Sequence, residues 1–348
     1  MNLEDLDWAA LDRLRDLFLA SQPIRTAYWR NGHDLACYDA TFGERIGWKW
    51  DAVLRALVAQ TKGVWSPPLG PLLDFGCGSG IAGRRVLSVF GESTFSALHL
   101  HDKARLAEDF AADQARSKFP TIPIVNGNPE VAFESGQPVT LLVSHVLNEL
   151  STSDTRRLMA LARRASAILW VEPGTSLASR QLIGVREALR GEFTILRPCP
   201  HQKTCGLLTA ARQADWCHHF AAPPPGLSMD PFWVRFARQA GIDLRSLPYS
   251  HLVLARQDSA PPELIANRTG EHRVIGRPRS FKGYLEVLNC GDGKVEQLTL
   301  QRRDQPELAD RLEETDEAIL ARWMIQGTRI RGGVIVEPQS ISSPEPLP

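Results

Sequence analysis

The sequence predicts an α/β fold with a Rossmann-like, doubly wound parallel sheet, and three observations support this prediction. Short apolar segments alternate with segments of helical periodicity from about residue 72 to residue 255. A glycine-rich turn, Gly76-Cys-Gly-Ser-Gly80, directly follows the first apolar segment. Acidic and polar side chains end the later apolar segments, and open α/β sheets bind their ligands at those strand ends.

The composition is that of an ordinary globular chain of 348 residues, long enough for two or three domains. Lys plus Arg and Asp plus Glu number 40 each, so no overall charge indicates a polyanionic partner, although a local basic face would suffice for RNA. No apolar run approaches the roughly 20 residues of a membrane span. Met1–Asp7 is acidic, unlike a signal or transit peptide. We therefore expect a cytoplasmic protein without a membrane partner; the oligomeric state is not predicted.

The expected elements follow from periodicity and from breaker residues. An N-terminal helical region (1–65) contains helices over about 3–20 and 48–60, and no chemistry is predicted for it. An α/β domain (66–258) follows. Its strands are expected at 72–75, 95–100, 139–144, 167–171, 193–196 and 251–255. Its helices are expected at 81–90, 104–118, 154–166, 178–190 and 229–240.

A small, basic, β-rich C-terminal domain is expected over 266–332, after a polar linker. Its signal is a hairpin of strands 281–288 and 295–302, joined at Gly291-Asp-Gly293. A helix is expected over 306–323. Residues 333–348 are expected to form a disordered tail, because most of them are Pro, Ser and other polar residues.

The glycine turn carries the first functional prediction. A Cβ at its glycines would block either the turn or a closely approaching nucleotide-like ligand. The spacing G-x-G-x-G lacks the further glycine of the dinucleotide fingerprint, so a nicotinamide-binding fold is the weaker alternative. Asp74, two residues before the first glycine, is the acid that class I S-adenosylmethionine-dependent methyltransferases commonly carry there. The turn residues that we expect to contact S-adenosylmethionine are Gly76, Cys77, Gly78 and Gly80.

Two side chains at later strand ends extend this candidate site. Asp102 follows the second strand, where an acid can accept both ribose hydroxyls of a nucleoside. His145 follows the strand 139–144 and is a candidate for touching the cofactor or acting as a base. The alternatives are that Asp102 faces solvent without binding a ligand and that His145 has a structural role. The sequence has no Asp/Asn-Pro-Pro-Tyr/Phe tetrad, the motif for methylating exocyclic amines, and the catalytic residues stay unknown.

Three of the six cysteines lie close together, in a proline-containing insertion at about 197–225 with spacing C-x5-C-x11-C: Cys199, Cys205 and Cys217. A loop with so little periodicity needs something to order it, and a metal or iron–sulfur cluster held by thiolates would do so. Cys290 is the candidate fourth ligand. Four thiolates favour a [4Fe–4S] cluster or zinc, and nearby histidines would also permit zinc on three thiolates and one imidazole: His201, His218 and His219. The alternative is a set of small buried hydrophobic residues.

The C-terminal domain also concentrates basic charge. From Arg268 to Arg303 there are eight Lys or Arg and four Asp or Glu. This excess predicts either a surface for a phosphate backbone or a solvated strand face.

Several segments in this order resemble the methyltransferase-like assembly factors of the small ribosomal subunit, a family known from mitochondria with bacterial relatives. They are Leu72-Leu-Asp-Phe-Gly, Ser144-His-Val-Leu-Asn-Glu-Leu150, Trp170-Val-Glu-Pro-Gly-Thr175, Pro198-Cys-Pro-His201 and Asp215-Trp-Cys-His218. The resemblance covers roughly residues 70–300, and its most specific part is the cysteine segment. The residues after Cys217 depart from the family pattern.

The resemblance implies a [4Fe–4S] cluster on Cys199, Cys205, Cys217 and Cys290. It further implies association with small-subunit rRNA during assembly, and rRNA methylation. Three functions are therefore open: an rRNA methyltransferase, a non-catalytic assembly factor whose cofactor and cluster are structural, and, less favoured, a small-molecule methyltransferase.

Overall fold

The computed structural model describes residues 2–19, 28–266, 268, 270–315 and 317–336. The chain divides into two compact units. Unit 1 comprises residues 1–51, 67–172 and 222–247, and unit 2 comprises 52–66, 173–221 and 248–348. Most of the expected tail, from 337 onward, lies outside the described residues, whereas 333–335 belong to a strand.

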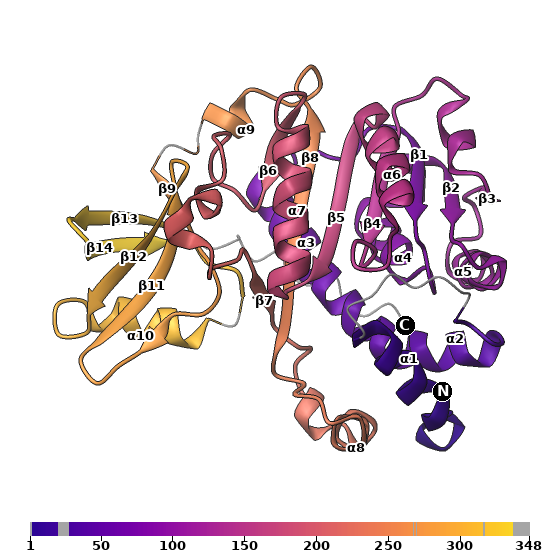
Figure 1. Cartoon of the computed structure of the whole chain (residues 1–348), viewed down its shortest axis with the longest axis horizontal. Coiled ribbons are helices and arrows are strands. Elements are labelled where there is room, and N and C mark those ends of the chain that lie inside the picture. Colours follow the sequence, from indigo (N-terminus) through magenta and orange to yellow (C-terminus); the bar gives the residue numbers. More distant parts are fainter. Residues whose placement is uncertain (1, 20–27, 267, 269, 316, 337–348) are drawn as a thin grey trace. The chain divides into compact units, whose positions relative to one another are not determined.

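Unit 1 contains five parallel strands in the order β3-β2-β1-β4-β5 (Figure 1). The strands are β1 (Gly70–Phe75), β2 (Phe95–His101), β3 (Ile124–Asn126), β4 (Thr140–Ser144) and β5 (Ala167–Pro173). Every residue of β1 is buried, as expected for a central strand with both faces covered. The strand order reverses between β1 and β4, which confirms the doubly wound sheet and places its ligand-binding edge beyond the ends of these strands.

The helices between these strands begin and end close to the expected positions. They are α4 (Ile81–Phe90), α5 (Arg105–Lys118) and α6 (Thr152–Arg164). Helix α6 begins two residues before the predicted start because the Ser151 side chain accepts a hydrogen bond from the Asp154 N–H and caps the helix. The sequence therefore predicted the sheet and its connections well, with β3 as the strand that it missed.

The N-terminal helices and α8 also belong to unit 1. They are α1 (Trp8–Leu19), α2 (Gly32–Tyr38), a π-helical turn (Asp39–Gly43), the first part of α3 (Glu44–Thr61), and α8 (Pro231–Ala240). Aromatic pairs join them: the Trp48 and Trp233 ring centroids lie 4.6 Å apart, and those of Phe42 and Phe236 lie 5.4 Å apart. Both helices predicted in this region are confirmed, while α2 was not predicted.

In unit 2, helix α7 (Ser176–Leu189) precedes β6 (Phe193–Arg197), which runs antiparallel to β8 (Leu247–Arg256). A three-residue strand, β7 (His219–Ala221), also pairs with β8. An antiparallel last strand is typical of class I methyltransferases. Together with the glycine turn after β1 and the strand order of unit 1, it supports the predicted fold class.

Residues 271–335 of unit 2 form a six-stranded sheet, with bounds β9 (Glu271–Val274), β10 (Arg279–Ser280), β11 (Tyr284–Gly291), β12 (Lys294–Gln301), β13 (Leu320–Gln326) and β14 (Arg329–Ile335). Strand β11 pairs with both β12 and β9, so five strands close into a ring in the order β9-β11-β12-β14-β13. Strands β12 and β14 are parallel, and helix α10 (Pro306–Glu314) connects β12 to β13. This connectivity is that of the OB-fold, a five-stranded Greek-key barrel.

The structure confirms the predicted β-hairpin and corrects one helix. Strands β11 and β12 pair up to Gly291 and Lys294, and the two turn residues, Asp292 and Gly293, both have positive φ angles. The helix predicted over 306–323 is wrong beyond residue 314. Ile319, Ala321 and Trp323 alternate inward and pack in the barrel core, and this period of two specifies a strand.

Candidate cofactor site and cysteine cluster

The glycine turn after β1 is closed by its own backbone hydrogen bonds. The amides of Gly76 and Cys77 both donate to the carbonyl oxygen of His101, at 2.7 and 3.0 Å. The Gly80 amide donates to the Cys77 carbonyl at 2.7 Å, and the Gly78 amide donates to a carboxylate oxygen of Asp102 at 3.0 Å. Because protein acceptors occupy these four amides, the turn is not a phosphate cradle of the P-loop kind.

Glycine suits the three glycine positions of the turn for different physical reasons. All have positive φ angles, which favour glycine. A Cβ on Gly76 would lie 2.6 Å from a methyl group of Val146, and one on Gly80 would lie 2.8 Å from the Cβ of Ala111. A Cβ on Gly78 would meet no atom within 4 Å. Gly76 and Gly80 are therefore required by packing, whereas Gly78 faces open space that a ligand can occupy.

The two aspartates of the site differ in position. Asp74 is fully buried in β1 below the turn, and burial raises its pKa to about 7. A Cβ on Gly83 of α4 would lie 3.0 Å from its carboxylate, so Asp74 supports the close approach of that helix. Asp102 is only partly buried, and its two oxygens accept from the amides of Gly78 and Ala104. Each oxygen keeps a second lone pair for a ligand hydroxyl.

His145 occupies a constrained position at the end of β4. Its φ angle is +57°, and its amide donates to the Val171 carbonyl at 2.8 Å. The ring Nε2 is buried and has no hydrogen-bond partner among the described residues. Burial, together with the neighbouring Lys49 ammonium, holds the pKa of His145 well below its usual value. In this position the imidazole is neutral and does not present Nε2 to solvent.

Sequence reasoning missed part of this site. The Tyr28 hydroxyl donates to a carboxylate oxygen of Glu149 at 3.2 Å. Burial, followed by the charge of Asp102, raises the pKa of Glu149 to about 8. Glu149 lies in residues 144–150, one of the segments that resemble the family. Nothing in the sequence indicates its contact with Tyr28, which lies 121 positions away. The N-terminal region, for which no chemistry was predicted, thus contributes to the site.

Glu172, at the end of β5, is a second missed acid. It is fully buried, and one of its oxygens accepts from the indole N–H of Trp170 at 2.7 Å and from the amides of Val146 and Leu147 at 3.2 Å. Burial raises its pKa to about 7. Four carboxyl groups with raised pKa values therefore stand at the ends of β1, β2, β4 and β5: Asp74, Asp102, Glu149 and Glu172.

The four predicted cysteine ligands all lie in unit 2, at the start of the loop after β6, further along it, and on β11. Cys205 and Cys290 share one apolar cluster with Ile183 of α7, and Cys217 packs against it. Burial is the main cause that raises the pKa of Cys290, and the charges of Cys199 and Cys205 add to it. The structure therefore brings together the three loop cysteines and the distant Cys290, and it leaves the other two, Cys37 and Cys77, in unit 1.

Polar groups surround these thiols. The Arg186 guanidinium donates through Nε to the sulfur of Cys199 at 3.1 Å. His201 Nε2 lies 3.6 Å from the Cys290 sulfur, and His219 Nε2 lies 3.8 Å from that of Cys217. Within the described part of the chain, no group of three or more His, Cys, Asp or Glu side chains is arranged to hold a metal ion.

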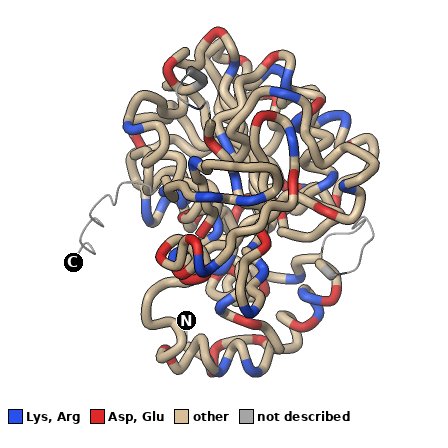
Figure 2. The backbone as a smooth tube through the Cα atoms, turned by 90° about the vertical axis from the view of Figure 1, so that its left-hand side faces the viewer, with Lys and Arg blue, Asp and Glu red and all other residues tan. Residues whose placement is uncertain are grey.

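The basic excess of the C-terminal domain is partly neutralised. Arg279 forms an ion pair with Glu286 at 2.8 Å, and the Arg277 guanidinium lies 4.1 Å above the ring of Phe220. In Figure 2 the positions of Lys and Arg are interspersed with those of Asp and Glu along the backbone. Whether this basic excess forms a surface for a phosphate backbone or a solvated strand face stays a prediction.

No helix within the described ranges is long and apolar enough to cross a membrane. Two solved structures illustrate what the fold is similar to. The magnesium protoporphyrin IX methyltransferase ChlM of Synechocystis PCC 6803 is 13% identical, with a TM-score of 0.38 over 72% of this chain and 95% of that one. The 23S rRNA methyltransferase ErmE is 12% identical, with a TM-score of 0.32 over 59% of this chain and 67% of that one. Identities this low do not transfer an activity.

No protein with a curated description matches the sequence. A family model does match it, under the description "Mitochondrial small ribosomal subunit Rsm22", over residues 38–308. This range contains the glycine turn and all four clustered cysteines. The match confirms the family resemblance of the sequence. The chain therefore belongs to the family of the mitochondrial small ribosomal subunit protein Rsm22.

Proposed function

We propose that this protein is an S-adenosylmethionine-dependent methyltransferase that acts on small-subunit rRNA. The observation that carries the proposal is the open space at Gly78, at the reversal point of the sheet and among buried carboxyl groups. Ligands of open α/β sheets bind at this point. The cofactor-binding residues in this proposal are Asp74, Gly76, Cys77, Gly78, Gly80, Asp102 and His145.

The electrostatics favour a cationic cofactor over a pyrophosphate. S-adenosylmethionine carries a sulfonium and an ammonium group, and carboxylates such as Glu149 and Asp102 stabilise positive charge. A dinucleotide would instead need free amides at the turn, and the turn amides are already bonded within the protein. Asp102, which also fixes the turn, is placed to accept ribose hydroxyls with its remaining lone pairs.

The residues of this chain would act mainly by positioning. The bound cofactor supplies an electrophilic methyl group, which passes to a nucleophilic atom of the RNA and leaves a neutral thioether. Holding the two in line supplies most of the rate. A base is needed only where the nucleophile carries a proton, and the catalytic residues stay unassigned.

An RNA partner has two supports. The family is named after a small ribosomal subunit protein. OB-folds bind oligonucleotides on the face of their second and third strands, here β11 and β12. Next to that face the rings of Phe281 and Tyr284 stack with centroids 4.7 Å apart, and Phe281 is 41% exposed. Exposed aromatic rings of this kind are platforms for unpaired bases.

We also propose that Cys199, Cys205, Cys217 and Cys290 hold a [4Fe–4S] cluster. Each iron of such a cluster binds one thiolate, so the four thiolates need not converge on one point, as they must around zinc. Three of these cysteines are buried and Cys217 is half-buried, and the Arg186 guanidinium offsets negative charge on Cys199. The family's description names mitochondria, and the cytoplasmic location expected from the sequence stays a prediction.

Deletion of the gene should remove one methyl group from small-subunit rRNA, and the wild-type gene should restore it. Mass spectrometry of nuclease digests of that rRNA measures this directly. A cofactor-blocked variant supplied in place of the wild type should fail to restore the methyl group. Unchanged rRNA methylation together with accumulated subunit precursors would instead support a non-catalytic assembly factor. The buried Nε2 of His145 favours this alternative, because a buried ring nitrogen is not placed to act as a base.

The affinity for S-adenosylmethionine should rise with pH between about 6 and 7.5. The folded pKa of Glu149 is raised to about 8, so without ligand the folded protein favours the protonated acid, and stability falls as the pH rises through that value. A cationic ligand favours the ionised acid, so the affinity should gain up to about tenfold per pH unit for one such group. Calorimetric titration measures it.

Glu149→Gln should flatten this pH dependence, because the amide does not ionise. Glu134→Gln, at an exposed glutamate of the same unit, is the matched control and should retain the wild-type slope. An affinity that is independent of pH in the wild-type protein would contradict the assigned role of Glu149.

A further inference from the structure

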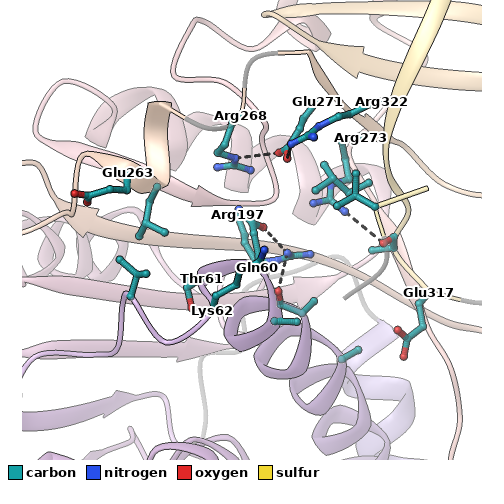
Figure 3. Close-up of a pocket in the computed structure, with 18 of the residues that line it drawn as sticks. Gln60, Thr61, Lys62, Arg197, Glu263, Arg268, Glu271, Arg273, Glu317 and Arg322 are labelled. Atoms are coloured by element: carbon teal, nitrogen blue, oxygen red, sulfur yellow. Dashed lines mark hydrogen bonds and ion pairs between the residues drawn. The ribbon is translucent and has the colours of Figure 1, made fainter. Parts of the chain in front are cut away.

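Unit 2 contains a cavity of about 370 Å³ that the proposed function does not use (Figure 3). Its walls come from the last turns of α3, from the end of β6, from β8 and β9, and from β13. Four arginines line it: Arg197, Arg268, Arg273 and Arg322. The first three are only 3%, 7% and 2% exposed.

Backbone carbonyls and Gln60 hold the three buried guanidinium groups in place. Arg197 donates to the Ala56 carbonyl at 3.1 Å and to the Gln60 side chain at 2.6 Å. Arg268 donates to the Leu196 carbonyl at 2.9 Å, and Arg273 donates to the carbonyls of Pro198 and Ala318 at 3.2 and 3.3 Å. These acceptors are neutral, so they orient the arginines without neutralising them.

Among the residues that the structure describes, one buried carboxylate faces these three cations. Glu271 lies 3.6 Å from the Nε of Arg268, and its other oxygen accepts from Arg322 at 3.3 Å. The remaining acids at the cavity, Glu263 and Glu317, are less buried, and Glu317 is paired with Arg55 at 2.5 Å. Buried charges are normally paired, so three buried guanidinium groups against one carboxylate leave positive charge uncompensated.

The same three arginines carry nitrogens without a hydrogen-bond partner. Arg197 Nε, Arg268 Nη2 and Arg273 Nη2 are buried and have no hydrogen-bond partner among the described residues. Orphaned N–H groups of buried cations are rare in proteins because they lose hydration without replacement. Three of them on neighbouring arginines indicate that the described residues of this cavity compensate its positive charge incompletely.

We propose that this cavity binds a phosphate group. The arginines come from β6, from the turn before β9 and from β9 itself, so positive charge lines the cavity from separate elements. A tetrahedral phosphate accepts hydrogen bonds from several directions, whereas a planar carboxylate is best matched by one guanidinium fork. The volume exceeds that of inorganic phosphate and leaves room for an attached group, as in a nucleoside monophosphate.

The cysteine cluster lies within electrostatic reach of two of these arginines. Burial lowers the pKa values of Arg268 and Arg273, and negative charge on Cys199 and Cys217, respectively, acts to raise them. The guanidinium that bonds a thiol is that of Arg186, which donates to Cys199 and does not line the cavity. The hydrogen bonds of the cavity arginines go to carbonyls and to Gln60 instead. The cavity therefore differs from the cluster site in its hydrogen bonds, and its test measures phosphate binding rather than the colour or metal content of the cluster.

The test is thermal unfolding and calorimetric titration of the full chain with inorganic phosphate, against chloride at equal ionic strength. Phosphate should raise the melting temperature, because a ligand that binds only the folded state stabilises it. Lys62→Glu places an acid at an exposed position of the cavity rim and should weaken phosphate binding about tenfold. Lys282→Glu makes the same change of charge away from the cavity and should leave the affinity unchanged.

Uridine 5′-monophosphate, which lacks the adenine of S-adenosylmethionine, distinguishes the sources of the phosphate. Tighter binding than inorganic phosphate would assign the site to a nucleotide, and equal or weaker binding would assign it to free phosphate. No stabilisation beyond that by chloride would overturn the proposal. Equal affinities in Lys62→Glu and Lys282→Glu would do the same, because the binding would then lie elsewhere on the chain.

Discussion

Gly78→Asn should remove S-adenosylmethionine binding while leaving the fold intact. The φ angle of Gly78 is +52°, a region that asparagine tolerates better than other side chains, so the variant adds little backbone strain. The new side chain would meet no protein atom at its Cβ and would extend into the open space assigned to the cofactor. We expect at least about a hundredfold loss of affinity, or about 2.7 kcal/mol, by calorimetric titration.

The matched control is Gly136→Asn. Gly136 also has a positive φ angle, +68°, also has no atom within 4 Å of an added Cβ, and lies in the same unit, away from the glycine turn. Both variants should melt within a few degrees of the wild type, and only Gly78→Asn should lose the cofactor. Wild-type affinity in Gly78→Asn would show that the cofactor does not occupy this space.

The α/β part of the fold was predictable because its signals are local. Buried strands such as β1 and β4 are short, mostly apolar segments, and helices such as α4 have clear starts and ends. The OB-fold was not predictable beyond its hairpin. Strands β9 and β10 contain four and two residues, and the end of the predicted helix 306–323 is a strand. Strands this short, which pair with strands far away in the sequence, have too few residues for an alternation of apolar and polar side chains to be detected.

The sequence predicted the glycine turn of the candidate cofactor site but not the side chains that surround the turn. Glycine spacing identifies Gly78, because only glycine suits both the φ angle and the open approach. The pairing of Tyr28 with Glu149, in contrast, exists only once the N-terminal helices pack in unit 1. The same holds for the arginine cavity. Arg197 and Arg273 are 76 positions apart, and no local sequence pattern indicates that both line one cavity.

Cys290→Ser should release the proposed iron–sulfur cluster. Anaerobically purified wild-type protein should be brown and contain about four iron and four sulfide per chain. Cys290 lies on β11, and the loop with the other three cysteines packs against the β11–β12 turn, where a Cβ on Gly206 would lie 2.7 Å from the Gly293 carbonyl oxygen. Because coordination would order that loop, loss of one thiolate should remove the colour and increase the rate of protease cleavage within residues 257–266.

Cys37→Ser is the matched control for this experiment. Cys37 is also fully buried, yet it lies in unit 1 and outside the cysteine cluster, so its replacement should change neither the colour nor the cleavage pattern. Colourless wild-type protein with one zinc per chain would keep the four-cysteine site and overturn the iron–sulfur assignment. Metal-free protein that is stably folded would contradict the site itself, because buried thiols that need no ligand behave as small hydrophobic side chains.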